Sequence, residues 1–297
     1  MTLIEIVNLL VSALLLAGIY AVMSVGMTVI YGVMKIVNLA HAGFMMMGAY
    51  LALELFERFH IDPILAALVV FPVMFAIGRA IHWLLVRWLP TSDQPTLASL
   101  LLMFGLWLVL QNLGYLIWGN SDRSIFTPHT LSILRFGGIT ISSVRLVVFG
   151  AAVACMVALQ LILNHTWFGR SVRALIQNRY AGQIVGVDDK KTASITFGLG
   201  IGFAGLAGAL LASLYSFNPD FGRPFLIRAF VIIVLGGLES VSGVAIGAFV
   251  LAFVETFGIL FVPAGYQLAI SYGLLVMVLI FLPGGMASLT AKVRRLA

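Results

Sequence analysis

Two polar side chains, Asn38 and His41, lie in an otherwise apolar stretch of small residues that spans residues 36–53. An amide can hydrogen-bond and an imidazole can also move a proton, but no nucleophile or pair of acidic residues stands beside them. Polar groups in hydrocarbon are costly unless paired, so they usually face a pathway or a partner helix. Asn38, His41 and the neighbouring Gly43 are therefore candidates for a polar pathway, with an interfacial helix end as the alternative.

A second polar break follows at Gly237-Leu238-Glu239-Ser240, and its one acidic residue stands beside Ser240 and Ser242. The start of a half-helix here would present backbone N–H groups to a carboxylate. A serine at this place can equally be the cap of the next helix. Glu239, Ser240 and Ser242 are thus candidates for the same pathway as Asn38, with capping as the alternative.

The remaining chemistry-bearing residues do not form an enzyme motif. The sequence has no G-x-x-x-x-G-K-S/T, so it lacks a P-loop for ATP. Its five histidines are scattered among different elements, and no Cys/His spacing predicts a metal site. The glycines between Gly198 and Gly208 have the spacing of close helix packing rather than of a dinucleotide site. We expect no catalytic residue, metal or cofactor in this chain.

Composition predicts the environment that positions these residues. The chain has 297 residues, of which 62% are hydrophobic and 9% charged. Soluble domains carry about 25% charged residues, so we expect an all-α polytopic membrane protein with one domain over residues 1–297. The net charge is +6, but the basic residues lie at the ends of apolar segments and form no clustered face of the kind that binds nucleic acid.

Apolar runs predict about eight transmembrane helices, because a helix needs about 20 residues to cross a bilayer. A broken or re-entrant pair is expected at 225–257, and Glu255 is expected to be interfacial. Glu54, Glu57, Arg58 and Asp62 should mark an exposed turn. The two polar breaks follow long spans of opposite direction, which predicts an inverted repeat. The expected spans are 8–33, 36–53, 63–88, 96–118, 139–163, 192–217, 225–236, 241–257 and 264–282.

The segment 164–191 is the longest polar stretch of the chain and carries three arginines and two lysines. Basic loops stay on the cytoplasmic side of the membrane, so the N-terminus should be periplasmic. The basic C-terminal tail, with Lys292 and Arg295, should be cytoplasmic. Apolar residues such as Val172 and Ile184 are mixed with the charges, which predicts a short amphipathic helix that lies on a soluble partner.

Three segments carry a resemblance to a known family. They are G-I-Y-A-V-M-S-V-G-M-T-V-I-Y-G-V-M-K-I-V-N-L-A-H-A-G-F-M-M-M-G-A-Y (18–50), G-R-S-V-R-A with a later G-V-D (169–188), and V-L-G-G-L-E-S-V-S-G-V-A-I-G (234–247). Over nearly its whole length the chain resembles the LivH-type permeases, which are membrane subunits of bacterial ABC importers for branched-chain amino acids and related small solutes. It departs from the family pattern at Ala42-Gly43 and at Glu239-Ser240-Val241-Ser242, both in the expected pathway.

The resemblance implies a location in the bacterial inner membrane and several partners. These are a second, homologous permease of the LivM type, two cytoplasmic ATP-binding subunits and a periplasmic solute-binding protein. It also implies that residues of the 164–191 loop dock onto the ATP-binding subunits. Gly186 would matter there because the turn after the short helix requires a residue without a side chain. The implied docking residues are Arg173, Ala174, Asn178, Ala181, Gly186 and Asp188.

Other functions remain open at this stage. The solute of such a permease can be a branched-chain amino acid, urea, a short amide or an aromatic acid. A passive channel of two half-helices is one alternative, although such a channel has no need of a long basic loop. An intramembrane enzyme that uses Asn38 and His41 is another, although no nucleophile accompanies them.

Overall fold

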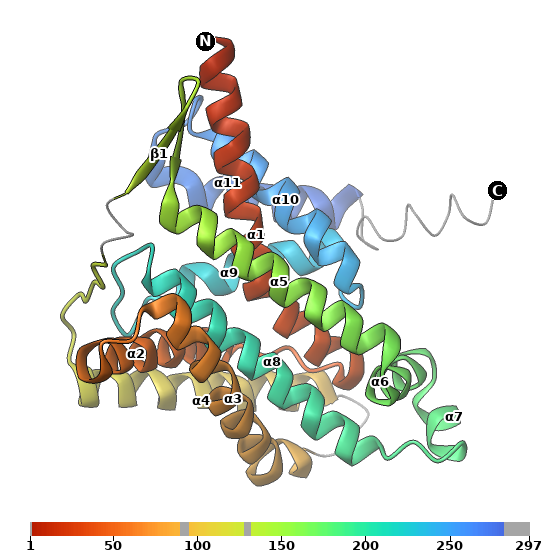
Figure 1. The fold of residues 1–297 in the computed structure, drawn as a ribbon. Coiled ribbons are helices and arrows are strands. Elements are labelled where there is room, and N and C mark those ends of the chain that lie inside the picture. The colour runs from red at the N-terminus through yellow and green to blue at the C-terminus, as the bar shows by residue number, and fades with distance from the viewer. Residues whose placement is uncertain (1, 90–94, 128–131, 282–297) are drawn as a thin grey trace.

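The computed structural model describes residues 2–89, 95–127 and 132–281, and most of these residues are helical (Figure 1). Six of the described helices are long and apolar enough to cross a membrane. The prediction of an all-α polytopic membrane protein is therefore confirmed. The described α-helices are α1 (Leu3–Met34), α2 (His41–Phe59), α3 (Pro63–Leu84), α4 (Pro95–Trp118), α5 (Ser143–His165), α6 (Trp167–Gln177), α7 (Arg179–Ile184), α8 (Asp189–Ala212), α9 (Gly222–Gly236), α10 (Val241–Gly258) and α11 (Gln267–Phe281).

A small β-hairpin precedes α5, where the sequence was expected to continue a polar loop and then enter a helix at residue 139. Its strands are β1 (Ile133–Phe136) and β2 (Ile139–Ser142), paired antiparallel. Asn8 of α1 ties the hairpin down, because its side chain accepts a hydrogen bond from the Thr140 N–H at 2.9 Å and donates to the Gly138 carbonyl at 3.3 Å. The hairpin therefore lies beside the start of α1, as Figure 1 shows.

Helix α8 is the centre of the bundle and packs against α1, α2 and α3. Its glycines permit this contact. A Cβ added at Gly208 would lie 1.9 Å from the Met45 carbonyl oxygen of α2, and one added at Gly200 would lie 2.6 Å from the Gly26 carbonyl of α1. Small residues at helix interfaces in membranes let backbones approach closely. The expected packing role of the glycines between Gly198 and Gly208 is confirmed.

The first polar break is an irregular link between α1 and α2. Helix α1 ends where Lys35 adopts a left-handed conformation (φ 56°), and α2 begins only at His41. The apolar run that starts at residue 36 was expected to be helical throughout, which is wrong for residues 36–40. The exposed turn starts later than expected, because α2 continues to Phe59 and carries a Glu54–Arg58 ion pair of 2.7 Å on its last turns; the chain turns at residues 60–62, where Asp62 caps α3.

The second break separates α9 from α10, which pack against each other as an antiparallel pair. A Cβ at Gly236 of α9 would lie 2.3 Å from the Gly243 carbonyl of α10, and one at Gly247 would lie 2.5 Å from the Ile232 carbonyl. An antiparallel pair fits the broken or re-entrant pair expected at 225–257, and α10 is the member of the pair that is long and apolar enough to cross a membrane. The basic C-terminal tail, with Lys292 and Arg295, lies outside the described residues.

Candidate functional site

The predicted pathway residues of the first break are fully buried in the chain. The side-chain nitrogen and oxygen of Asn38 find no hydrogen-bond partner among the described residues. His41 places its Nε2 2.7 Å from the Met23 carbonyl oxygen in the middle of α1. Gly43 lies against Leu110 of α4, where an added Cβ would be 3.0 Å from the leucine side chain. The break thus holds unpaired polar groups deep inside the bundle, where each costs free energy.

The residues of the second break lie nearer the surface. Glu239 forms an ion pair with Lys35, so the two breaks meet at the end of α1, although each charged side chain remains 46% exposed. Ser240 is the N-cap of α10 and accepts a hydrogen bond from the Gly243 N–H at 3.0 Å. The Ser242 hydroxyl lies 3.2 Å from that of Ser240. Ser240 is therefore a helix cap, as the alternative interpretation expected, and Glu239 connects the two breaks through its ion pair with Lys35.

A polar cluster inside the bundle was missed by the sequence analysis. Glu255 of α10 was expected at the interface, but its side chain is only 2% exposed. It accepts hydrogen bonds from Tyr20 of α1, Ser271 of α11 and the Arg228 Nε of α9, the last at 2.9 and 3.2 Å to its two oxygens. A buried carboxylate must be paired in this way. The one signal available was a charge inside each of two otherwise apolar helices, Arg228 in α9 and Glu255 in α10.

This cluster lines a cavity of about 340 Å³ between α1, α5, α9, α10 and α11. Ligand sites in proteins typically have volumes of about 300–1,000 Å³. None of the residues predicted for the pathway lines it. Its walls are formed by Leu9, Ser12, Leu15, Leu16, Ile19, Tyr20, Arg145, Val148, Leu214, Tyr215, Phe225, Arg228, Glu255, Thr256, Ile259 and Gln267.

The polar loop at 164–191 folds into two short helices, α6 and α7, at the far end of α5 from the β-hairpin (Figure 1). The expected amphipathic helix is α6, which buries Val172 and Leu175. Thr166 begins it as the N-cap and accepts from the Gly169 N–H at 3.1 Å. Arg173 donates to the Leu163 carbonyl at the end of α5, which joins α6 to the bundle. The buried face of α6 therefore packs on this chain itself.

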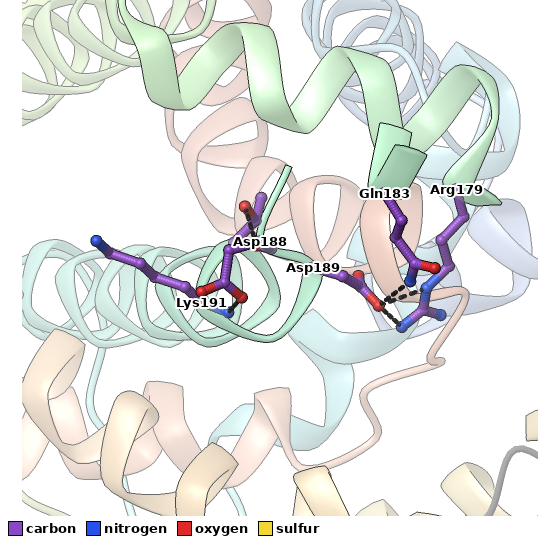
Figure 2. A network of polar contacts seen from close by, with 6 residues as sticks. Arg179, Gln183, Asp188, Asp189 and Lys191 are labelled. Atoms are coloured by element: carbon purple, nitrogen blue, oxygen red, sulfur yellow. Dashed lines mark hydrogen bonds and ion pairs between the residues drawn. The ribbon is translucent and has the colours of Figure 1, made fainter. Parts of the chain in front are cut away.

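Helix α7 is held by a polar network that reaches the start of α8 (Figure 2). Arg179 donates from Nε and Nη2 to the Asp189 Oδ2 at 2.9 and 2.7 Å, and Gln183 donates to the same oxygen at 3.2 Å. Asp188 is the N-cap of α8 and accepts from the Lys191 N–H at 2.9 Å. The network fixes the direction in which α7 leaves the bundle.

Three of the predicted docking residues shape the loop through the backbone. Asn178 caps α7 and accepts from the exposed Ala181 at 3.0 Å. Gly186 has a φ of +87°, and its N–H donates to the Gln183 carbonyl at 3.0 Å. Such a left-handed turn strongly favours glycine. Asp188 then starts α8, while Ala174 lies partly buried on α6.

The ordered loop leaves large apolar side chains uncovered. Tyr180, Ile184 and Val185, which we name the apolar crest, are each more than two-thirds exposed on α7 and its end. These three residues lie in the polar loop beyond the end of α5. Contiguous exposed apolar side chains with a polar rim mark an interaction surface. Ile184 was expected as an apolar member of the loop, but the sequence did not indicate that it is one of the exposed ones.

Comparison with known proteins identifies the family to which the chain belongs. The family model described as "Branched-chain amino acid transport system / permease component" matches residues 9–282. The high-affinity branched-chain amino acid transport system permease protein BraD of Pseudomonas aeruginosa is 28% identical over 287 residues, with 93% of this chain and 94% of BraD covered.

Two further relatives cover most of both chains. The LivH permease of Escherichia coli K12 is 26% identical over 281 residues, 91% of each chain. A probable LivH of Methanocaldococcus jannaschii is 27% identical over 259 residues, 84% of this chain and 79% of its own. No solved structure matches the chain significantly. This chain is a member of the branched-chain amino acid transport system permease family, a membrane-embedded permease component of an ABC importer.

Proposed function

We propose that the chain carries branched-chain amino acids, or a closely related small polar solute, across the bacterial inner membrane. Two separate cytoplasmic ATP-binding subunits supply the energy, a second homologous permease completes the membrane part, and a periplasmic binding protein delivers the solute. The functions of the relatives support the solute class. The observation that supports the coupling is the apolar crest, an exposed surface on the loop beyond the end of α5.

Reconstitution tests this proposal directly. The permease pair, its ATP-binding subunits and the binding protein are placed in proteoliposomes, and uptake of labelled leucine, isoleucine and valine is measured with and without ATP. We expect uptake only with ATP and all components present. Uptake by the permease alone would instead identify a passive channel, and ATP-driven uptake of urea with none of leucine would reassign the solute.

Replacing Gly186 with valine should abolish co-purification of the ATP-binding subunits while membrane insertion stays intact. Valine at a φ of +87° is strained by about 1–3 kcal/mol, so the turn must change and α7 with it. Gly186→Asn is the matched control, because asparagine tolerates the left-handed region, and it should retain the subunits. Normal co-purification of the valine variant would remove Gly186 from the docking geometry.

Replacing Asn38 or His41 with leucine should lower ATP-driven uptake at least about tenfold, which corresponds to about 1.4 kcal/mol, while the ATP-binding subunits remain bound. The reason is that both residues hold polar groups at the break between α1 and α2 that a moving solute can pair with. Initial uptake rates and co-purification are measured on the same preparations. Unchanged uptake would show that these two side chains only pack.

A further inference from the structure

The cavity between α1, α5, α9, α10 and α11 combines a charged cluster with apolar walls. Arg228 and Glu255 are among its polar lining residues, and their side chains are 11% and 2% exposed. A charge in a transmembrane segment is costly and usually marks a substrate pathway or a proton relay. A buried ion pair is also weak evidence for stability, since apolar residues of similar volume are often as good or better. The position of the ion pair in the wall of a cavity therefore indicates a role in binding rather than in packing alone.

The hydrogen bonds of the cluster show which group is free to bind. Glu255 is fully used, because it accepts from Tyr20, Ser271 and Arg228. Arg228 donates to Glu255 only from Nε, and its two terminal nitrogens make no hydrogen bond to another described residue. One face of the guanidinium lies over the Phe225 ring at 5.7 Å. Glu255 thus orients Arg228, and the two terminal nitrogens of the guanidinium remain available to a ligand.

The charge and the lining residues of the cavity indicate which kind of ligand it can bind. Its charged lining residues are Arg145, Arg228 and Glu255, which sum to one positive charge. A guanidinium edge pairs best with a carboxylate, which it can grip with two parallel hydrogen bonds. The lining also contains leucine, isoleucine and valine side chains such as Leu16, Ile19 and Val148. The lining therefore complements a small molecule with a carboxylate and a branched aliphatic side chain.

We propose that this cavity is a solute-binding site in which Arg228 binds the carboxylate of an aliphatic amino acid and Glu255 is the positioning residue for Arg228. The site lies along the first half of α1, from Leu9 to Tyr20, on the side of the β-hairpin. This inference rests on the proposed function, in which that side faces the binding protein. It narrows the solute: urea and short neutral amides have no carboxylate for Arg228 and do not use the site.

Equilibrium binding tests the site without the binding protein, whose own selectivity would mask it. The complete permease–ATPase complex in nanodiscs is titrated with tritiated leucine, and unlabelled competitors are added. Isocaproate, which is leucine without its amino group, should compete. Leucinamide, in which the carboxylate is an amide, should compete at least about tenfold less well. Equal competition by both compounds, or no displaceable leucine binding, would overturn the proposal.

Variants separate binding from folding. Arg228→Lys keeps the charge beside Glu255 but loses the second donor edge, and Ser12→Phe fills the cavity without touching the cluster. Both should weaken leucine binding at least about tenfold with an unchanged melting temperature. Arg223→Gln removes a cation from the same helix outside the cavity, and should bind normally. Normal binding by both Arg228→Lys and Ser12→Phe would refute the site.

Glu255→Gln distinguishes a positioning residue from a direct contact. If Glu255 acts through Arg228, the affinities for leucine and isocaproate fall together, whereas a direct contact with the amino group would weaken leucine alone. A loss of binding sites without a change in affinity would show that Glu255 only supports the fold. ATP-driven uptake of leucine is measured in parallel on the parent complex and on the variants. If the variants transport leucine as the parent does, the site is rejected and the proposed function is kept. If the parent complex itself shows no uptake, the proposed function is rejected.

Discussion

Replacing Ile184 and Val185 together with aspartate is expected to prevent the ATP-binding subunits from associating with the permease. Both side chains belong to the apolar crest and are more than 70% exposed. Burial of such a side chain at an interface contributes about 1.5–3 kcal/mol, and a carboxylate in its place must be desolvated. We expect the affinity to fall by at least about 100-fold, or about 2.7 kcal/mol.

The measurement is affinity co-purification followed by titration of the ATP-binding subunit onto permease in nanodiscs. Ile133→Asp with Leu134→Asp is the matched control, since it places the same two charges on adjacent, exposed apolar residues of the β-hairpin. The control should retain the subunits. If the crest variant binds as the parent does, the contact with the ATP-binding subunits lies elsewhere on the loop.

The second large effect is expected from Gly208→Val at the centre of the bundle. The added Cβ would lie 1.9 Å from the Met45 carbonyl, and the obstacle is backbone, which cannot rotate away. Helices α2 and α8 must separate, and overpacking of this kind costs about 1–3 kcal/mol or more. We expect a large loss of folded protein in the membrane and a lower melting temperature.

Gly105→Val is the control for this variant, because it makes the same substitution inside α4, where no heavy atom lies within 4 Å of the added Cβ. The two variants are compared by fluorescence size-exclusion chromatography and by thermal unfolding in detergent. The Gly105 variant should behave like the parent. Equal stability of the two variants would contradict the close approach of α2 and α8.

Local patterns predicted the parts of this molecule that depend on local physics. Apolar length predicted the spans, the polar mixture at 164–191 predicted α6, and the need for a turn predicted Gly186, whose φ is +87°. The hairpin was missed although its signal was present. Gly137 and Gly138 both have positive φ, and a Gly-Gly pair between two alternating strands is typical of a two-residue hairpin turn.

The parts that were missed depend on tertiary contacts. Glu255 meets Arg228 27 positions away, and Glu239 meets Lys35 204 positions away. Nothing local in the sequence distinguishes a charge that snorkels to an interface from one that finds a buried partner. The sequence marked a polar break at Asn38 and His41, but the residue at which α2 begins depends on tertiary packing, mainly that of α2 against α8.

Accessibility of the apolar crest tests the central claim most directly, namely that cytoplasmic subunits drive the bundle through α7. Val185→Cys is made in a Cys155→Ser background, which removes the only other cysteine, and is labelled with a membrane-impermeant maleimide. We predict no labelling in intact cells, strong labelling in inside-out vesicles stripped of the ATP-binding subunits, and protection when those subunits are restored. Labelling from outside intact cells, or labelling that the subunits do not reduce, would contradict the account.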